Sequence, residues 1–69
     1  MTNPANRTLR QLVSNVTLIA AFHRNGGELN GSQISICEAL VEKIDEIGFA
    51  SCSPRLQEVY KAALVMPVL

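Results

Sequence analysis

The sequence predicts an all-α fold: a small domain of two longer helices and a shorter C-terminal helix. Three stretches carry apolar residues at steps of three and four, which places them on one face of an α-helix. No segment keeps the alternation of apolar and polar residues expected of a half-buried strand. Neither a repeat nor a linker divides the 69 residues, so we expect residues 1–69 to form a single domain.

The first helix is expected to begin near Asn3 or Asn6, because Pro4 suits the first helical position after an asparagine cap. It should end at the Asn-Gly-Gly sequence of residues 25–27, since glycine readily adopts the left-handed conformation common after helices. Its core-facing stripe contains Leu9, Leu12, Val13, Val16, Ile19, Ala20 and His23.

Leu18 and Phe22 lie one turn apart on the opposite side of this first helix. A helix with apolar groups on two sides needs two surfaces to pack against. A chain this short also buries only a small core. We therefore expect a second copy or another protein to cover Leu18 and Phe22. The alternative is that the other two helices wrap the first one on both sides.

The second helix is expected to begin at the capping-box pattern of Ser35 and Glu38, with Ser32 as an alternative cap. Residues 26–34 then form a loop with a turn at Asn30 and Gly31. Gly48 should end the helix. Its apolar face contains Ile36, Cys37, Leu40, Val41, Ile44 and Ile47. Its other side carries the acidic residues Glu38, Glu42, Asp45 and Glu46.

The third helix has a strong start signal, with Ser53 as cap and Pro54 at the first helical position. Pro67 should stop it, because proline cannot continue the helical hydrogen bonds. The apolar stripe contains Leu56, Val59, Tyr60, Ala63 and Leu64. The apolar tail of Met66, Val68 and Leu69 either packs against the domain or is available to a partner.

The charges are unevenly placed, although they sum to zero. Residues 1–27 carry +3, residues 28–48 carry −4 and residues 49–69 carry +1. A dedicated nucleic-acid binder usually shows a basic excess, so direct nucleic-acid binding is not expected. The acidic side of the second helix is suited to a basic protein surface, such as a DNA-binding domain. A solvated helix face is the simpler explanation.

The residues that could perform catalysis or bind metal are few and scattered. Two cysteines and one histidine form neither a catalytic triad pattern nor a four-ligand zinc pattern. We expect no enzyme activity, no metal and no cofactor. His23 should be partly buried and hydrogen-bonded, Cys37 should act as a small core hydrophobe, and Cys52 should lie in a loop. Without a secretory signal or a membrane span, we expect a cytoplasmic protein with free thiols.

The second and third helices, with their short connection, leave a helix-turn-helix DNA-binding regulator as the alternative function. Residues 54–65 would be the recognition helix and would offer Arg55, Gln57 and Lys61 to DNA. The preceding helix would bring four acidic residues toward the phosphates, which is unfavourable. Protein binding is therefore the preferred interpretation.

Across residues 9–25, 35–48 and 54–65, the chain resembles the anti-quorum-sensing anti-activator proteins of Mu-like temperate phages of pseudomonads. The resemblance covers length, helical make-up and the absence of a catalytic motif. It implies a homodimeric inhibitor, made in the host cytoplasm for host takeover, that prevents a LuxR-type quorum-sensing regulator from binding DNA. It also implies binding to the pilus-assembly ATPase. From the residues themselves, we expect the partner-binding surface to comprise Glu38, Glu42, Asp45, Glu46, Leu18 and Phe22.

Overall fold

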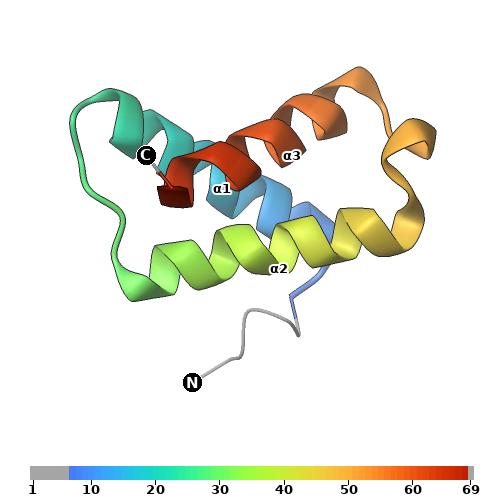
Figure 1. Cartoon of the computed structure of the whole chain (residues 1–69), viewed down its shortest axis with the longest axis horizontal. Coiled ribbons are helices and arrows are strands. Elements are labelled where there is room, and N and C mark those ends of the chain that lie inside the picture. Colours follow the sequence, from blue (N-terminus) through green and yellow to red (C-terminus); the bar gives the residue numbers. More distant parts are fainter. Residues whose placement is uncertain (1–6, 69) are drawn as a thin grey trace.

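Figure 1 shows three helices joined by short connections in a computed structural model that describes residues 7–68. The order is α1 (Leu9–Arg24), α2 (Gly31–Ile47) and α3 (Pro54–Val65), with the short 3₁₀ helices η2 (Phe49–Ser51) and η3 (Met66–Val68) on either side of α3. The predicted all-α class is confirmed, since the described residues contain no strand. The two longer helices have 16 and 17 residues and the C-terminal one has 12.

Helix α1 begins at Leu9, later than the sequence predicts. The Thr8 hydroxyl accepts a hydrogen bond from the backbone N–H of Gln11 at 3.2 Å. In return, the Gln11 side chain accepts one from the Thr8 backbone N–H at 2.9 Å. This capping box satisfies two backbone donors at once and sets the start. The predicted caps, Asn3 and Asn6, lie outside the described residues.

The end of α1 agrees with the prediction. The helix stops at Arg24, and the backbone N–H of Asn25 still donates to carbonyl oxygens of the last turn. Gly26 follows with a φ of 91°, a left-handed conformation that glycine adopts without a steric penalty. The chain can therefore reverse direction within a few residues and begin α2.

Helix α2 begins one full turn before the predicted start at Ser35, and also before the alternative at Ser32. Asn30 is the cap: its Oδ1 accepts from the Gln33 backbone N–H at 2.9 Å, and the Gln33 side chain accepts from the Asn30 N–H at 2.8 Å. The Asn-Gly pair that suggested a turn is therefore a helix start. At the other end, Gly48 has a φ of 101° and ends the helix as predicted.

The start of α3 is confirmed as predicted. The Ser53 hydroxyl accepts a hydrogen bond from the Leu56 backbone N–H at 3.3 Å, and Pro54 occupies the first turn. The α-helix ends at Val65, ahead of Pro67, and the chain continues as the single 3₁₀ turn η3. The apolar tail residues in this turn differ in exposure: Met66 is buried, whereas Val68 is 83% exposed.

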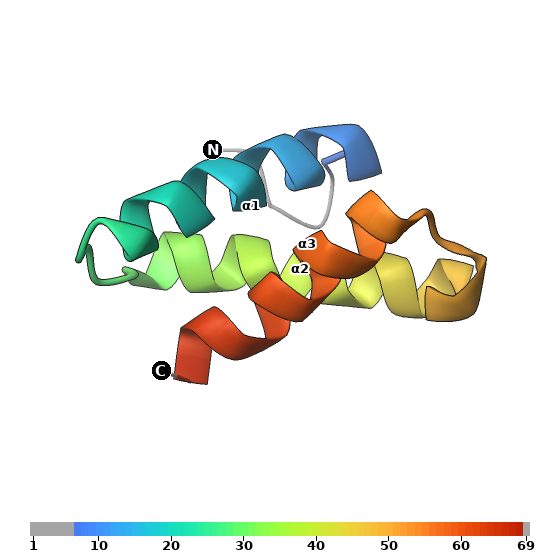
Figure 2. The same cartoon turned by 90° about the horizontal axis from the view of Figure 1, so that it is seen from above.

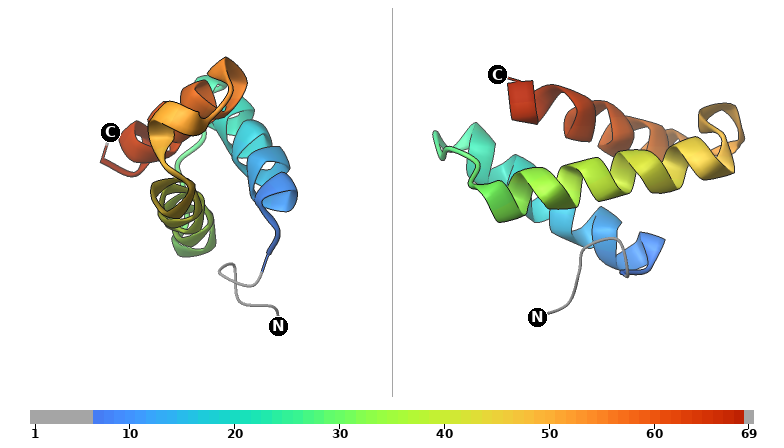
Figure 3. Two further views of the ribbon diagram at one scale, coloured as in Figure 1. Left: turned by 90° about the vertical axis from the view of Figure 1, so that its right-hand side faces the viewer. Right: turned by 60° about the horizontal axis from the view of Figure 1, so that its bottom comes forward.

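The core lies where all three helices pack against one another. Figure 2 shows α3 crossing α2, and the end-on view in Figure 3 shows α1 and α2 on opposite sides of α3. The centres of the predicted stripes are buried, but Ile47 and Leu64 remain about half exposed. No helix within residues 7–68 is both long and apolar enough to cross a membrane. The buried residues are Leu12, Val16, Ile19, Cys37, Ala39, Leu40, Ile44, Ala63 and Met66.

Candidate protein-binding grooves

Several large apolar side chains of the described residues remain exposed, and they are not spread evenly. Leu18 and Phe22 lie on α1, Ile47 and Phe49 lie where α2 turns into η2, and the others lie between residues 64 and 68. Exposed apolar groups that gather beside a groove mark interaction surfaces better than single ones do. The complete set is Leu18, Phe22, Ile47, Phe49, Leu64, Val65 and Val68.

A groove of about 580 Å³ lies between α2 and the C-terminal part of α3 with η3. Its charged lining residues, Glu38 and Glu42, are both acidic and both belong to α2. Leu64 and Val68 bring exposed apolar surface to the opposite wall. We call this site the acidic groove; it is lined by Glu38, Val41, Glu42, Ala63, Leu64, Pro67 and Val68.

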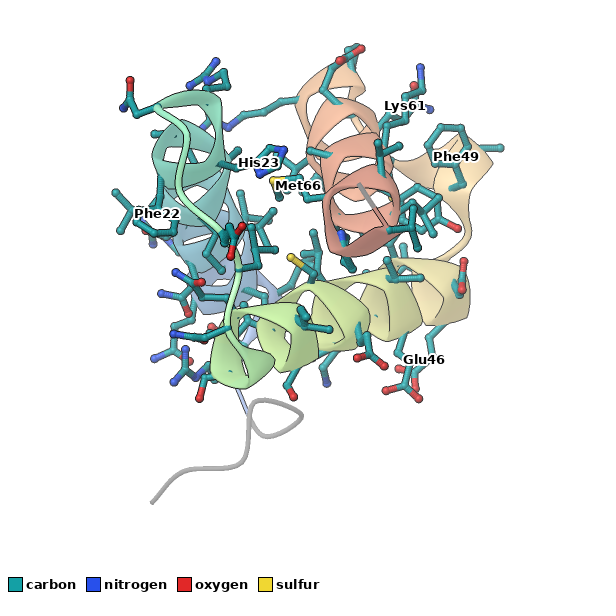
Figure 4. The ribbon with its side chains drawn as sticks, turned by 60° about the vertical axis from the view of Figure 1, so that its left-hand side comes forward. Phe22, His23, Glu46, Phe49, Lys61 and Met66 are labelled. Carbon is teal, nitrogen blue, oxygen red and sulfur yellow. The ribbon has the colours of Figure 1, made fainter. Side chains whose placement is uncertain are left out.

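The four predicted acidic residues of α2 are all exposed, as expected, but their surroundings differ. Glu38 and Glu42 line the acidic groove beside apolar side chains. Asp45 accepts a hydrogen bond from the Tyr60 hydroxyl at 2.9 Å. Glu46 points away from the other helices in Figure 4. Only the first two therefore combine negative charge with an apolar surface that a partner could bury.

The bond between Tyr60 and Asp45 belongs to a small cluster that joins α3 to the end of α2. The Phe49 ring lies 5.2 Å from the Tyr60 ring, centroid to centroid. The Gln57 side-chain amide donates to the Phe49 carbonyl oxygen at 3.1 Å. The hydrogen bond to the Asp45 carboxylate raises the pKa of Tyr60, because it favours the protonated phenol. This hydrogen bond thus links α3 to the end of α2.

A second groove, of about 540 Å³, lies between the first half of α1 and the first turn of α3. Its charged lining residues, Arg10 and Arg55, are both basic. Leu18, which is 68% exposed, stands at this groove and not at the acidic one. We call this site the basic groove; it is lined by Leu9, Arg10, Val13, Ser14, Thr17, Leu18, Arg55 and Leu56.

Phe22 is 46% exposed, and its ring also has an internal role. The ring covers Gly27 so closely that a Cβ atom there would lie 2.4 Å from ring carbons. The Gly27 backbone N–H also donates to the Phe22 carbonyl oxygen at 3.0 Å. Phe22 therefore helps to shape the turn after α1, and it lines neither groove.

His23 is half-buried, as predicted, but the predicted hydrogen bond is absent at one ring nitrogen. Its Nδ1 is buried and has no hydrogen-bond partner among the described residues. Figure 4 shows the imidazole beside Met66, and both line a cavity of about 260 Å³ with Glu28. The ring has packed against a thioether, which is at best a weak acceptor.

The two cysteines are free and differ in exposure. Cys37 is fully buried on the core face of α2, as predicted. Burial, and to a lesser degree the charge of Glu38, raises the pKa of the Cys37 thiol. The Cys52 thiol is half-buried and donates to the Gly48 carbonyl oxygen at 3.4 Å. Within residues 7–68, no three His, Cys, Asp or Glu side chains gather in a way that could hold a metal ion.

The side chains proposed for DNA reading in the helix-turn-helix alternative are only partly available. The Gln57 amide is bound to the Phe49 carbonyl oxygen. Arg55 lines the basic groove, and Lys61 lies 4.0 Å from Glu58 on the same helix. These contacts give no specific support to a base-reading role for α3.

Sequence reasoning offered Val68 to a partner but did not place an apolar wall opposite the acidic residues, and it missed the whole basic groove. It assigned Leu64 to the core stripe, whereas the side chain is 47% exposed. One signal was present: Ala63, Leu64 and Val65 are three consecutive apolar residues, which span about 200° of a helix and so cannot all face one core. The basic groove combines α1 with α3, so it depends on how distant segments cross.

In the comparisons with known proteins, no family model, curated protein or solved structure matches this chain.

Proposed function

We propose that this chain is an inhibitor that acts by binding another protein, with the acidic groove as its main contact. The target is a transcription activator, and the bound surface is its positively charged DNA-binding domain. Binding there would keep the activator off its promoter, because the same basic surface contacts the DNA phosphates. No catalytic step is involved.

The observation that carries this proposal is the union of charge and apolar surface in one groove. Glu38 and Glu42 on α2 face a wall to which Leu64 and Val68 contribute exposed apolar groups. Charge complementarity speeds encounter with a basic partner. Exposed charges are screened beyond about 8 Å at physiological salt, so lasting affinity depends on the apolar side chains.

The resemblance described above supports the choice of target. It favours a LuxR-type quorum-sensing regulator as the activator, the pilus-assembly ATPase as a second target, and a phage-encoded homodimer in the host cytoplasm as the working form. The negative charge of residues 28–48 agrees with a basic target, since DNA-binding domains carry a basic face.

Surface plasmon resonance against a purified LuxR-type regulator tests the proposal. Glu38→Lys combined with Glu42→Lys should slow association and weaken its salt dependence. Leu64→Ser should mainly speed dissociation. Glu28→Lys combined with Glu46→Lys is the matched control, because it makes the same charge change outside both grooves. Circular dichroism would confirm that each variant folds.

A gel-shift assay completes this test. The wild-type chain should release the regulator from its operator DNA, and should not itself shift DNA at low salt. If the regulator binds the Glu38→Lys, Glu42→Lys variant as it binds the wild type, the acidic groove is not the contact. A shift of DNA by the chain alone would favour the helix-turn-helix alternative.

A further inference from the structure

The basic groove runs along one continuous face of α1. Six of its eight lining residues belong to α1, and they occur as neighbouring pairs at steps of four between residues 9 and 18. Residues four apart lie one turn above each other, so this face extends over about two and a half turns, roughly 14 Å. Helix α3 contributes Arg55 and Leu56, both from its first turn. Most of the face is therefore open, and its exposed α1 residues are Arg10, Ser14, Thr17 and Leu18.

One end of this groove carries positive charge that the groove itself does not neutralise. Arg10 and Arg55 are exposed, and neither forms an ion pair within residues 7–68. Figure 2 shows that α1 and α3 begin at the same end of the molecule, and neither first turn contains an acidic residue. The amino-terminal ends of helices are themselves partly positive. Carboxylates of a partner would therefore be attracted to this end.

The rest of the groove is suited to apolar side chains. Leu18 is 68% exposed at the other end of the α1 face, and Leu9, Val13 and Leu56 are half-buried along the groove. The Thr17 hydroxyl, which lies between these apolar groups in sequence, donates to the Val13 carbonyl oxygen at 2.8 Å. A partner could thus cover Thr17 without leaving its hydroxyl donor unpaired, which would be costly.

We propose that the basic groove binds an amphipathic helix of another protein, one with acidic residues beside its apolar stripe. The helix lies along α1, with its apolar side chains against Val13, Leu18 and Leu56 and its carboxylates at Arg10 and Arg55. Binding of an amphipathic helix in an apolar groove is a recurrent mode of peptide recognition. The inference does not rest on the proposed function. The two grooves share no lining residue and lie on different sides of α3, so both can be occupied together.

A protein helix fits this groove better than a small ligand or a nucleic-acid strand does. Small-ligand sites bury most of the ligand, whereas five of the eight lining residues here are exposed. Sites for single-stranded nucleic acid combine a basic track with aromatic side chains on which bases stack. This groove has two arginines, and no aromatic residue is among those that line it. A nucleic-acid strand would also leave Leu18 without an apolar contact.

Selection from a displayed library of random peptides tests the proposal without assuming a partner. The peptides are about 15 residues long, enough for more than three helical turns. The full wild-type chain is the target. The variant Arg10→Glu with Arg55→Glu is the counter-target, which removes peptides that bind elsewhere on the chain. The recovered peptides should carry apolar residues at steps of three and four, together with an excess of Asp and Glu.

Fluorescence anisotropy with the best recovered peptide then measures each part of the groove. Arg10→Gln with Arg55→Gln should weaken binding by about tenfold, because the partner's carboxylates lose their charged contacts. Leu18→Ser should weaken it by about fivefold, because an apolar contact is lost. Leu18 is mostly exposed, so the variant should keep its helices, and circular dichroism would confirm this.

Two matched controls lie outside this groove. Arg24→Gln with Lys61→Gln makes the same change in net charge, and Val68→Ser makes a similar apolar loss. Both should bind the peptide as the wild type does.

Four outcomes would overturn the proposal. The first is recovery of no peptide that prefers the wild type to the counter-target, which is also the result expected if a second copy covers the groove. The second is a set of acidic peptides without apolar periodicity. The third is equal weakening by the charge control. The fourth is displacement of the peptide by single-stranded DNA at physiological salt, which would make the groove a nucleic-acid site. All four concern the basic groove, so they are independent of whether Glu38 and Glu42 bind a regulator.

Discussion

At the scale of single residues, Leu40 and Ile44 show how much a short chain depends on a few buried side chains. Both were predicted to lie on the core face of α2, and neither has any exposed surface. We expect Leu40→Ala or Ile44→Ala to lower the free energy of unfolding by about 2–5 kcal/mol, because each leaves a cavity in the core. Chemical denaturation followed by circular dichroism measures this change.

Ile47 provides the control, since it belongs to the same predicted face but is 51% exposed. Ile47→Ala should change the free energy of unfolding by only about 0.5 kcal/mol, as is usual for surface positions. A loss below about 1 kcal/mol for Leu40→Ala would mean that this side chain is not part of a packed core.

Tyr60 offers a spectroscopic test, because it is the only tyrosine among the 69 residues. Its pKa is raised by the hydrogen bond to Asp45, so phenol ionisation should require a higher pH in the folded chain than in a denatured one. Asp45→Asn should lower this pKa toward the ordinary range, because the carboxylate charge is removed. Absorbance titration would measure both, with Glu46→Gln as the control that leaves the midpoint in place.

The same shift predicts the sign of a stability change. A raised folded-state pKa means that the stabilisation is fully present below the ordinary tyrosine pKa and is lost as the pH rises through the raised one. The advantage of the wild type over Tyr60→Phe in thermal unfolding should therefore shrink at alkaline pH. A difference that grows with pH would contradict the bond.

Residue-level predictions from the sequence succeeded where periodicity decides and failed where packing decides. Cys37, Leu40 and Ile44 repeat at helical steps, so their burial followed from local pattern alone. The surroundings of His23 could not be predicted in this way, because Met66 comes from the far end of the chain to line the same cavity.

At the scale of whole helices, the end of α2 could be predicted from the sequence, but its start could not. Gly48 was identified correctly as the end of the helix. Its φ of 101° is a backbone conformation that glycine adopts without a steric penalty. The start was misplaced because Asn30 and Gly31 serve equally well as a turn or as a cap followed by the first helical residue. The competing patterns at Ser32 and Ser35 are also valid caps, and the sequence alone cannot rank them.

Alanine substitutions at the competing caps distinguish the two starts. Asn30→Ala should lower the free energy of unfolding by about 0.5–2 kcal/mol, because it removes the acceptor for the Gln33 backbone N–H. Ser35→Ala should be neutral or slightly stabilising, since Ser35 lies inside α2 and alanine is the better helix former. Thermal unfolding of both variants measures the difference, and the reverse order would place the helix start at Ser35.

At the scale of the whole molecule, the two grooves are features whose apolar walls could not be predicted from the sequence alone. The sequence predicted an acidic α2 and an exposed side of α1, and both were confirmed at Glu38, Glu42 and Leu18. It could not show that Leu64 and Val68 would stand opposite the acids, because that depends on how α3 crosses α2. The sequence shows which residues are charged, whereas only the fold shows which apolar side chains lie beside them.

The last prediction follows from the apolar edge of the acidic groove. Val68 lines this groove and is 83% exposed, so it packs against little of its own chain. Val68→Ser should therefore leave the thermal unfolding of the chain nearly unchanged, but should weaken its binding to a fluorescent regulator DNA-binding domain, because an apolar contact with the partner is lost. Anisotropy titrations measure the affinity, with circular dichroism to confirm the fold. An unchanged affinity of the folded variant would remove Val68 from the contact.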